Sequence, residues 1–141
     1  MNAPLYTVEI LRLAASLPAP VTLGRIDGMA DRRSPTCGSK VHTDVALDRE
    51  GRVAGLSQAV TACAFGQASA SLVAASAVGR SAEEVAQAVE SLRNWLSGDH
   101  DDPGTWPGLS ALSAARSRIG RHGAIVLPFE TLLDAIKAAR R

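Results

Sequence analysis

The fold is decided by residues 40–60, which read KVHTDVALDREGRVAGLSQAV. Apolar and polar residues alternate over residues 40–47, which is the period of a strand with one buried face. Residues 48–51 end in Gly51, and a glycine there suits the left-handed position of a three-residue hairpin loop. Residues 52–60 return as a second strand. This stretch therefore predicts a β-hairpin.

Apolar residues at helical spacing predict helices on both sides of the hairpin. Ser81 and Glu84 have the spacing of a capping box. Pro128 is tolerated in the first turn of a last helix. Residues 18–36 are rich in proline, glycine and charge, and are expected to form a connecting loop with extended pieces. The predicted helices are residues 5–16, 66–78 and 82–97, a short helix within residues 107–118, and a final helix from Leu127 to about Ala139.

The composition bounds the class of protein. A chain of 141 residues with 46% hydrophobic and 21% charged residues has an ordinary globular composition, and it suits one domain with a real core over residues 1–141. A net charge of +1 and 4% aromatic residues argue against binding of nucleic acid. No apolar run reaches the roughly 18–20 residues of a membrane span, and no secretory signal is visible. We therefore expect no membrane contact and a cytoplasmic location.

The two cysteines, Cys37 and Cys63, lie just outside the two ends of the predicted hairpin. If residue 48 faces residue 52, paired positions sum to about 100, and the two cysteines fall opposite each other. Their odd numbers place them on the predicted core face with Val41. In the cytoplasm such a pair is more often a metal or catalytic site than a structural disulfide.

A zinc or iron–sulfur site usually has four ligands, so two thiolates need further partners. His122 is the best candidate for a third ligand, because His42 points away from Cys37 by strand parity and His100 lies in an acidic loop. The residues alone leave two other interpretations open. The cysteines can be small buried apolar residues, or they can form a reversible disulfide.

Several motifs in order resemble those of the IscU/NifU/SufU scaffold family of iron–sulfur cluster assembly, of the NifU-like N-terminal type. The resemblance extends from Tyr6 to about Ala139. Ser34-Pro35-Thr36-Cys37-Gly38 is similar to the family's Asn-Pro-x-Cys-Gly-Asp, and the segment from Ala62 to Ser71 is similar to its Gly-Cys followed by a small-residue helix. The predicted hairpin and the turn before Ser81 are two further features that resemble the family.

This resemblance implies a scaffold and not an enzyme. Its fold would be α+β, a small antiparallel sheet packed against several helices like that of SufE and NifU, with the ligand cysteines at one end of the sheet. A protein of this kind binds a transient [2Fe–2S] cluster, iron or zinc. Its expected partners are a cysteine desulfurase, which delivers sulfur, and acceptor apoproteins. We expect a monomer or a weak homo-oligomer.

Two positions depart from the family's pattern. Ser39 stands where the family has an aspartate, and Gly123 stands where the third cysteine is expected. The resemblance therefore implies a divergent site of Cys37, Cys63 and His122. The expected surroundings of these three ligands are Ser39, Lys40, Arg121 and Gly123. Two alternatives remain: a persulfide acceptor or zinc-binding accessory of a desulfurase, and a regulatory binding module without metal.

Overall fold

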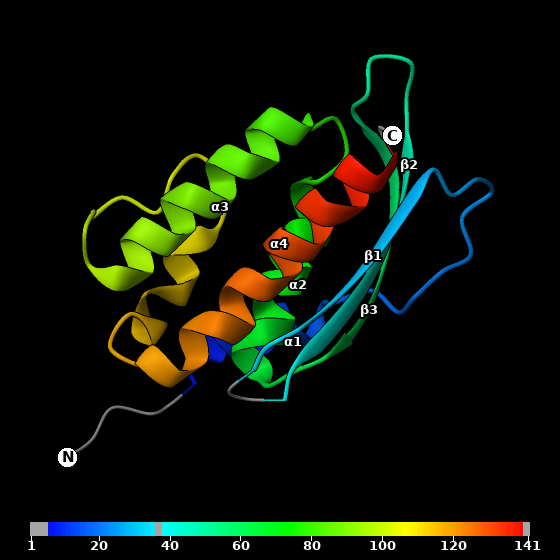
Figure 1. Cartoon of the computed structure of the whole chain (residues 1–141). Coiled ribbons are helices and arrows are strands. Elements are labelled where there is room, and N and C mark those ends of the chain that lie inside the picture. Colours follow the sequence, from blue (N-terminus) through cyan, green and yellow to red (C-terminus); the bar gives the residue numbers. More distant parts are fainter. Residues whose placement is uncertain (1–5, 36–37, 140–141) are drawn as a thin grey trace.

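The computed structural model describes residues 6–35 and 38–139 of the 141-residue chain, and it confirms the α+β class. In the described part of the chain, a three-stranded antiparallel sheet in the order β1-β2-β3 has helices on one face (Figure 1). Helices α2 and α4 pack on the sheet, and α3 packs on α4. The elements are α1 (Val8–Ala15), β1 (Gly28–Arg33), β2 (Lys40–Leu47), β3 (Val53–Thr61), α2 (Ala64–Ser76), α3 (Ala82–Ser97), the 3₁₀ segments η1 (Leu109–Ala115) and η2 (Ile119–Arg121), and α4 (His122–Ala139).

The predicted hairpin is confirmed as β2 and β3. Gly51 has a φ of 81°, which is the left-handed conformation that its loop requires. The side chain of Asp48 accepts hydrogen bonds from the backbone N–H groups of Glu50 and Arg52 at 2.9 Å. An aspartate that bonds to the backbone of its own turn in this way fixes the loop conformation, and with it the pairing of the two strands.

The hairpin register differs by one residue from the predicted one. Lys40 pairs with Thr61 and Ala46 pairs with Gly55, so paired positions sum to 101 over most of the ladder. An irregularity between Ala46 and Leu47 absorbs the extra residue. Since a shift of one residue exchanges the two faces of a strand, the inward residues beyond the bulge carry even numbers, such as Gln58. The parity argument for Cys63 was therefore wrong.

Residues 18–36, predicted as a connecting loop with extended pieces, contain a strand whose bounds and pairing the sequence did not predict. Residues 28–33, GMADRR, form β1 and pair with β2 from Gly28↔Val45 to Arg33↔Lys40. None of these residues is β-branched or aromatic, so the local sequence favours no strand. Their pairing with β2 and their contact with α4 supply the stabilisation instead.

The helices follow the predicted pattern except at the start of α4. The capping box at Ser81 is present in full, with reciprocal bonds to Glu84, and Gly98 ends α3 in the left-handed conformation. Helix α4 begins at His122, five residues before the predicted start, and Pro128 lies inside it. A proline there cannot donate a hydrogen bond to the carbonyl of Ala124. The early start places His122 in a helix and not in a loop.

Replacing Gly28 with alanine is expected to lower the free energy of unfolding by about 1–3 kcal/mol, the usual cost of overpacking. A Cβ atom at Gly28 would lie 2.1 Å from the carbonyl oxygen of Ala135 and 2.8 Å from the Cβ of Ala139. Both belong to α4, so β1 and α4 would have to separate. Urea unfolding measures the change. Gly24→Ala is the control, because a Cβ at Gly24 meets no atom within 4 Å. Equal stability of the two variants would contradict this packing.

Candidate functional site

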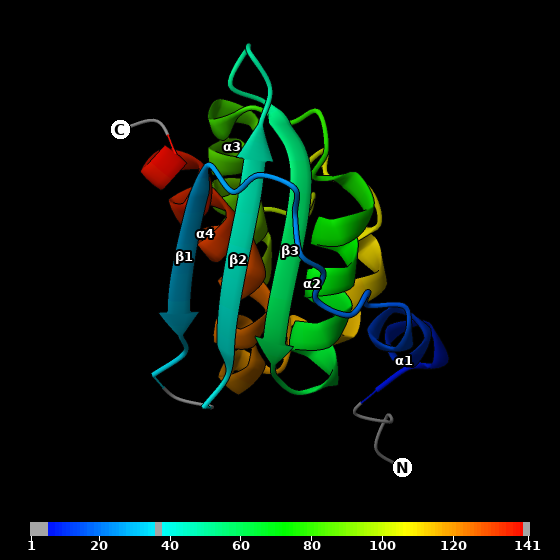
Figure 2. The same cartoon turned by 90° about the vertical axis from the view of Figure 1, so that its right-hand side faces the viewer.

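Three segments that carry the predicted ligands or their neighbours meet at one end of the molecule. They are the adjoining ends of β1 and β2, the passage from β3 into α2, and the first turn of α4, which all lie at the lower end in both views (Figures 1 and 2). The cross-strand pairs Arg33↔Lys40 and Lys40↔Thr61 fix the sheet side of this end. These three segments are therefore neighbours at one end of the fold, and the ligand set itself stays a prediction.

Cys63 is the N-cap residue of α2. Its backbone is extended, with φ −67° and ψ 173°, and its side chain makes no capping hydrogen bond. The residue is half-buried, contacts the hydrophobic core and carries a free thiol. Cys63 therefore lies between the end of β3 and the first turn of α2, at the strand end before a helix where the sequence predicts it.

Cys37 lies outside the described residues, but the residues on either side of it are described. The N–H of Ser34 donates to the carbonyl of Ser39 at 2.8 Å, which closes the loop across its base. Ser39 is buried, at 3% exposure, while Lys40 is exposed. The serine that stands at the family's aspartate position therefore lies in the protein interior.

His122 is the first residue of α4 and is half-buried. Its Nε2 lies 2.9 Å from the carbonyl oxygen of Ala115 and 3.1 Å from that of Arg116. Because both partners are carbonyl oxygens, which only accept, Nε2 is the donor nitrogen of these contacts. Imidazoles that bind metals are usually oriented by a bond of this kind. The predicted metal binding by His122 would therefore use Nδ1.

Close packing joins the helix that carries Cys63 to the helix that carries His122. A Cβ atom at Gly66 would lie 3.3 Å from the carbonyl oxygen of Ala124, so glycine allows the near approach of the two helices. The buried hydroxyl of Ser69 donates to the carbonyl of Ile125 at 2.5 Å. The small residues of α2 thus set the distance between the first turns of α2 and α4.

The described residues alone do not make a metal site. Over residues 6–35 and 38–139, no group of three or more His, Cys, Asp or Glu side chains is placed to hold a metal ion. The set of Cys37, Cys63 and His122 includes a residue beyond those ranges and stays a prediction. Of its expected surroundings, Arg121 is half-buried and Gly123 is exposed in the first turn of α4.

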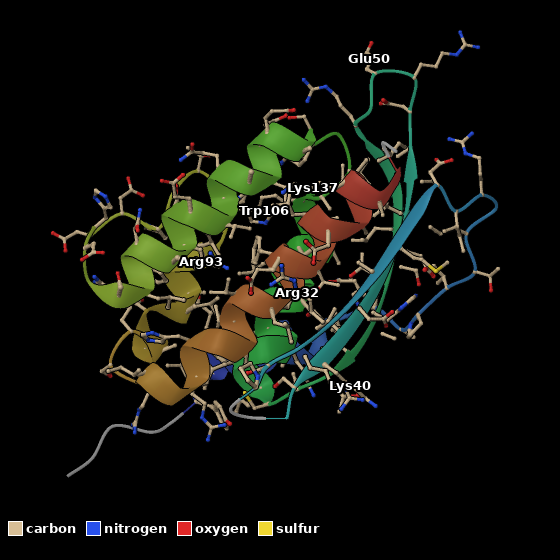
Figure 3. The ribbon with its side chains drawn as sticks, in the orientation of Figure 1. Arg32, Lys40, Glu50, Arg93, Trp106 and Lys137 are labelled. Carbon is tan, nitrogen blue, oxygen red and sulfur yellow. The ribbon has the colours of Figure 1, made fainter. Side chains whose placement is uncertain are left out.

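An ion-pair network that the sequence did not predict ties the sheet to the helices near this end. Arg32 on β1 pairs with Glu130 at 2.9 Å and with Asp134 at 2.5 Å, and Arg93 on α3 also pairs with Glu130. Figure 3 shows the two arginines on either side of α4. Arg32 is about 100 residues from its two partners along the chain, and Arg93 is 37 residues from Glu130, so no local sequence signal reveals these pairs. The network connects β1, α4 and α3.

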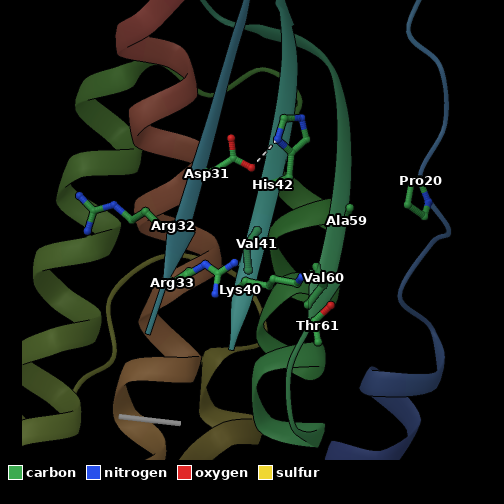
Figure 4. Close-up of a pocket in the computed structure, with 10 residues that line it drawn as sticks. All are labelled: Pro20, Asp31, Arg32, Arg33, Lys40, Val41, His42, Ala59, Val60 and Thr61. Atoms are coloured by element: carbon green, nitrogen blue, oxygen red, sulfur yellow. Dashed lines mark hydrogen bonds and ion pairs between the residues drawn. The ribbon is translucent and has the colours of Figure 1, made fainter. Parts of the chain in front are cut away.

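His42 lies on the sheet face opposite the helices, as its parity predicts, between two carboxylates. One ring nitrogen is 2.8 Å from Asp31, as Figure 4 shows, and the other is 2.7 Å from Asp44. The hydrogen bond with Asp31 is the main cause that raises the pKa of His42 above 6.5, and Asp44 adds to it. Protonated His42 therefore stabilises the folded protein below pH 6.5, and this contribution fades as the pH rises through the raised pKa.

Replacing His42 with glutamine is expected to lower the free energy of unfolding more at about pH 5.5 than at about pH 9. The difference should be about 0.2–1 kcal/mol, since these side chains are partly solvated. Urea unfolding of both proteins at the two pH values measures it. A cost that does not change with pH would show that the charge of His42 contributes nothing.

Solved structures of other proteins align with nearly the whole chain, whereas sequence comparisons find no match. No protein-family model matches the sequence, and no curated protein matches it. The chain is similar to the crystal structure of a nitrogen-fixing NifU-like protein (N-terminal) from Brucella abortus, with a TM-score of 0.89 and 28% identity over 96% of this chain and 94% of that one.

Two further solved structures share the fold. A protein of Fervidobacterium islandicum AW-1, assigned as an iron–sulfur cluster assembly scaffold for the SUF system, has a TM-score of 0.80 and 17% identity, and the match covers 94% of this chain and 96% of that one. A hypothetical protein has a TM-score of 0.68 and 20% identity over 92% and 97% of the two chains. The motifs, the fold and the NifU-like neighbour together confirm the resemblance to the IscU/NifU/SufU-type scaffold family.

Proposed function

We propose that this chain is a scaffold in iron–sulfur cluster assembly, which holds iron or a transient [2Fe–2S] cluster on Cys37 and Cys63 with His122 as the third ligand. One observation carries the proposal. The segments that bear Cys63 and His122, and the strand ends that flank Cys37, lie at one end of a NifU-like fold. A cytoplasmic location, where thiols stay reduced, suits this role.

The proposed ligand set explains why the binding would be transient. Two thiolates and one imidazole leave a fourth position for water, an added thiol or a residue of a partner. Ser39 is a poor ligand at neutral pH, since its hydroxyl is not ionised. An open position lets iron and sulfide enter and lets the cluster leave. Because imidazole binds metal only when neutral, acid should weaken the site.

The position of Cys63 favours a second candidate function, in which its thiol accepts sulfur from a cysteine desulfurase. The half-buried thiol is free and makes no capping hydrogen bond. Its thiolate would attack the outer sulfur of the persulfide on the desulfurase. A new S–S bond would form on Cys63, the old S–S bond would break, and the desulfurase cysteine would leave as a thiolate. Acceptor apoproteins would then receive the assembled product.

Anaerobic purification followed by reconstitution tests these proposals. The protein is incubated with iron, cysteine and a cysteine desulfurase, and bound iron, zinc and sulfide are measured together with the visible spectrum. Charge-transfer absorption with bound iron and sulfide is expected of a scaffold. Mass spectrometry that finds one added sulfur on Cys63, without bound iron, would favour the acceptor role. A protein that gains neither metal nor sulfur would contradict both roles and favour a module without metal.

Replacing Gly123 with cysteine is expected to slow the loss of bound iron to a chelator by about tenfold, the effect of about 1.4 kcal/mol of added binding energy. The resemblance implies a third cysteine at this position, and Gly123 is exposed in the first turn of α4. Gly120→Cys is the control, because it adds a thiol to the neighbouring η2 segment at a position where a Cβ has open space. Equal rates for the two variants would count against Gly123 as a ligand position.

A further inference from the structure

The face of the sheet opposite the helices is covered by chain only in part. The segment between α1 and β1 crosses this face over β3 and the far half of β2, as Figure 2 shows. It is held there by the hydrogen bond from the N–H of Val21 to the hydroxyl of Ser57 at 2.9 Å, and Leu23 packs near Gly55. The remaining half, toward the ligand-bearing end, forms a cavity of about 570 Å³. We call this cavity the outer-face pocket.

A row of three polar side chains crosses the floor of the outer-face pocket. Arg33 pairs with Lys40, and Lys40 pairs with Thr61, so the three residues lie side by side on three adjacent strands (Figure 4). All three are exposed and line the pocket. Adjacent strands are about 4.8 Å apart, so the row spans about 10 Å. It presents two cations and one hydroxyl.

Within the part of the chain that the structure describes, neither Arg33 nor Lys40 forms an ion pair. The residue just before Arg33, Arg32, points to the other face of the sheet and pairs with Glu130 and Asp134 of α4. The pocket carboxylate, Asp31, is engaged by His42. Like charges placed directly opposite each other on neighbouring strands destabilise a sheet. The pocket therefore keeps an unfavourable pair that a bound anion would relieve.

We infer that the outer-face pocket binds an acidic, extended segment of a partner protein, whose carboxylates lie between Arg33 and Lys40. Apolar surface beside the row, from Pro20 and Ala59, would contact the intervening side chains. An extended segment repeats its side chains on one face about every 6.8 Å, so neighbouring carboxylates can reach both cations of the row. The site needs neither metal nor a cysteine, and it adds a docking surface to the proposed scaffold.

Binding of a labelled peptide tests the inference. The probe is a fluorescein-labelled peptide of four Glu-Ala repeats, and a labelled peptide of four Gln-Ala repeats is its neutral control. Binding is measured by fluorescence anisotropy at about 20 mM salt. The acidic peptide should bind, and the double variant Arg33→Glu, Lys40→Glu should bind it at least about tenfold more weakly. The variant Arg12→Glu, Arg49→Glu changes the charge equally at exposed positions outside the pocket and should bind as the parent does.

Three results would overturn the inference. One is an equal loss in both double variants, which would mean that only net charge matters. Another is displacement of the peptide by inorganic phosphate beyond the effect of sodium chloride at the same ionic strength, which would indicate a small-anion site. The third is tighter binding of a single-stranded oligonucleotide than of the peptide. The same measurement on Cys37→Ser, Cys63→Ser separates this inference from the proposed function, because peptide binding should persist there even if the protein binds no iron.

Discussion

Replacing Cys63 with alanine is expected to abolish the visible charge-transfer absorption of the reconstituted protein and to reduce bound iron at least about tenfold. The thiolate of Cys63 would be one of the two on which the whole site depends. Loss of a residue that only hydrogen-bonds to a metal ligand usually lowers metal affinity by about 10–100-fold, and loss of a ligand itself usually costs more. The measurement is iron and sulfide analysis with the absorption spectrum after anaerobic reconstitution.

The fold should survive this change, which makes the result interpretable. Cys63 is half-buried and its side chain makes no capping hydrogen bond, so no structural bond is lost. Cys63→Ser is the matched control, since serine is a preferred N-cap residue but a poor metal ligand. The serine variant should keep or raise the thermal midpoint and still lose the iron. Full iron binding by either variant would contradict the role of Cys63.

Replacing Phe65 with alanine is expected to lower the free energy of unfolding by about 3–5 kcal/mol, the largest stability effect that we predict for a single residue. Phe65 is fully buried in the first turn of α2, and its ring lies 5.0 Å from that of Tyr6, measured between centroids. Truncation would leave a cavity between α1, α2 and the sheet. Urea or thermal unfolding measures the loss.

The matched controls separate packing from the ring–ring contact. Phe65→Leu keeps most of the buried volume and should cost less than alanine does. Tyr6→Leu removes the other ring of the pair, and aromatic pairs contribute about 0.5–1.5 kcal/mol beyond their buried area. A cost below about 1 kcal/mol for Phe65→Ala would show that this residue does not hold α2 in the core.

The sequence predicts those elements whose signals are local. The hairpin of β2 and β3 follows from alternation and from Gly51, and the start of α3 follows from Ser81 and Glu84. Such signals act within a few residues, so they can be read directly from the chain. The position of Cys63 just before α2 was predicted from a local pattern of the same kind.

Features that depend on distant contacts were not predictable. The strand β1 exists because Gly28–Arg33 pairs with β2, and nothing in its own residues favours a strand. The bulge between Ala46 and Leu47 shifts the register, which no local pattern revealed. The outer-face pocket depends on both, because the β1 pairing places Arg33 beside Lys40 and the shifted register places Thr61 opposite Lys40.

The most direct test of the proposed site is a crystal structure of the iron-loaded protein, grown without oxygen and phased at the iron edge. We predict iron within about 2.0–2.5 Å of the sulfur atoms of Cys37 and Cys63 and of Nδ1 of His122, with Nε2 still bonded to the carbonyl of Ala115. Iron bound elsewhere, or an Nδ1 atom more than about 7–8 Å from both sulfurs, would contradict the three-ligand site.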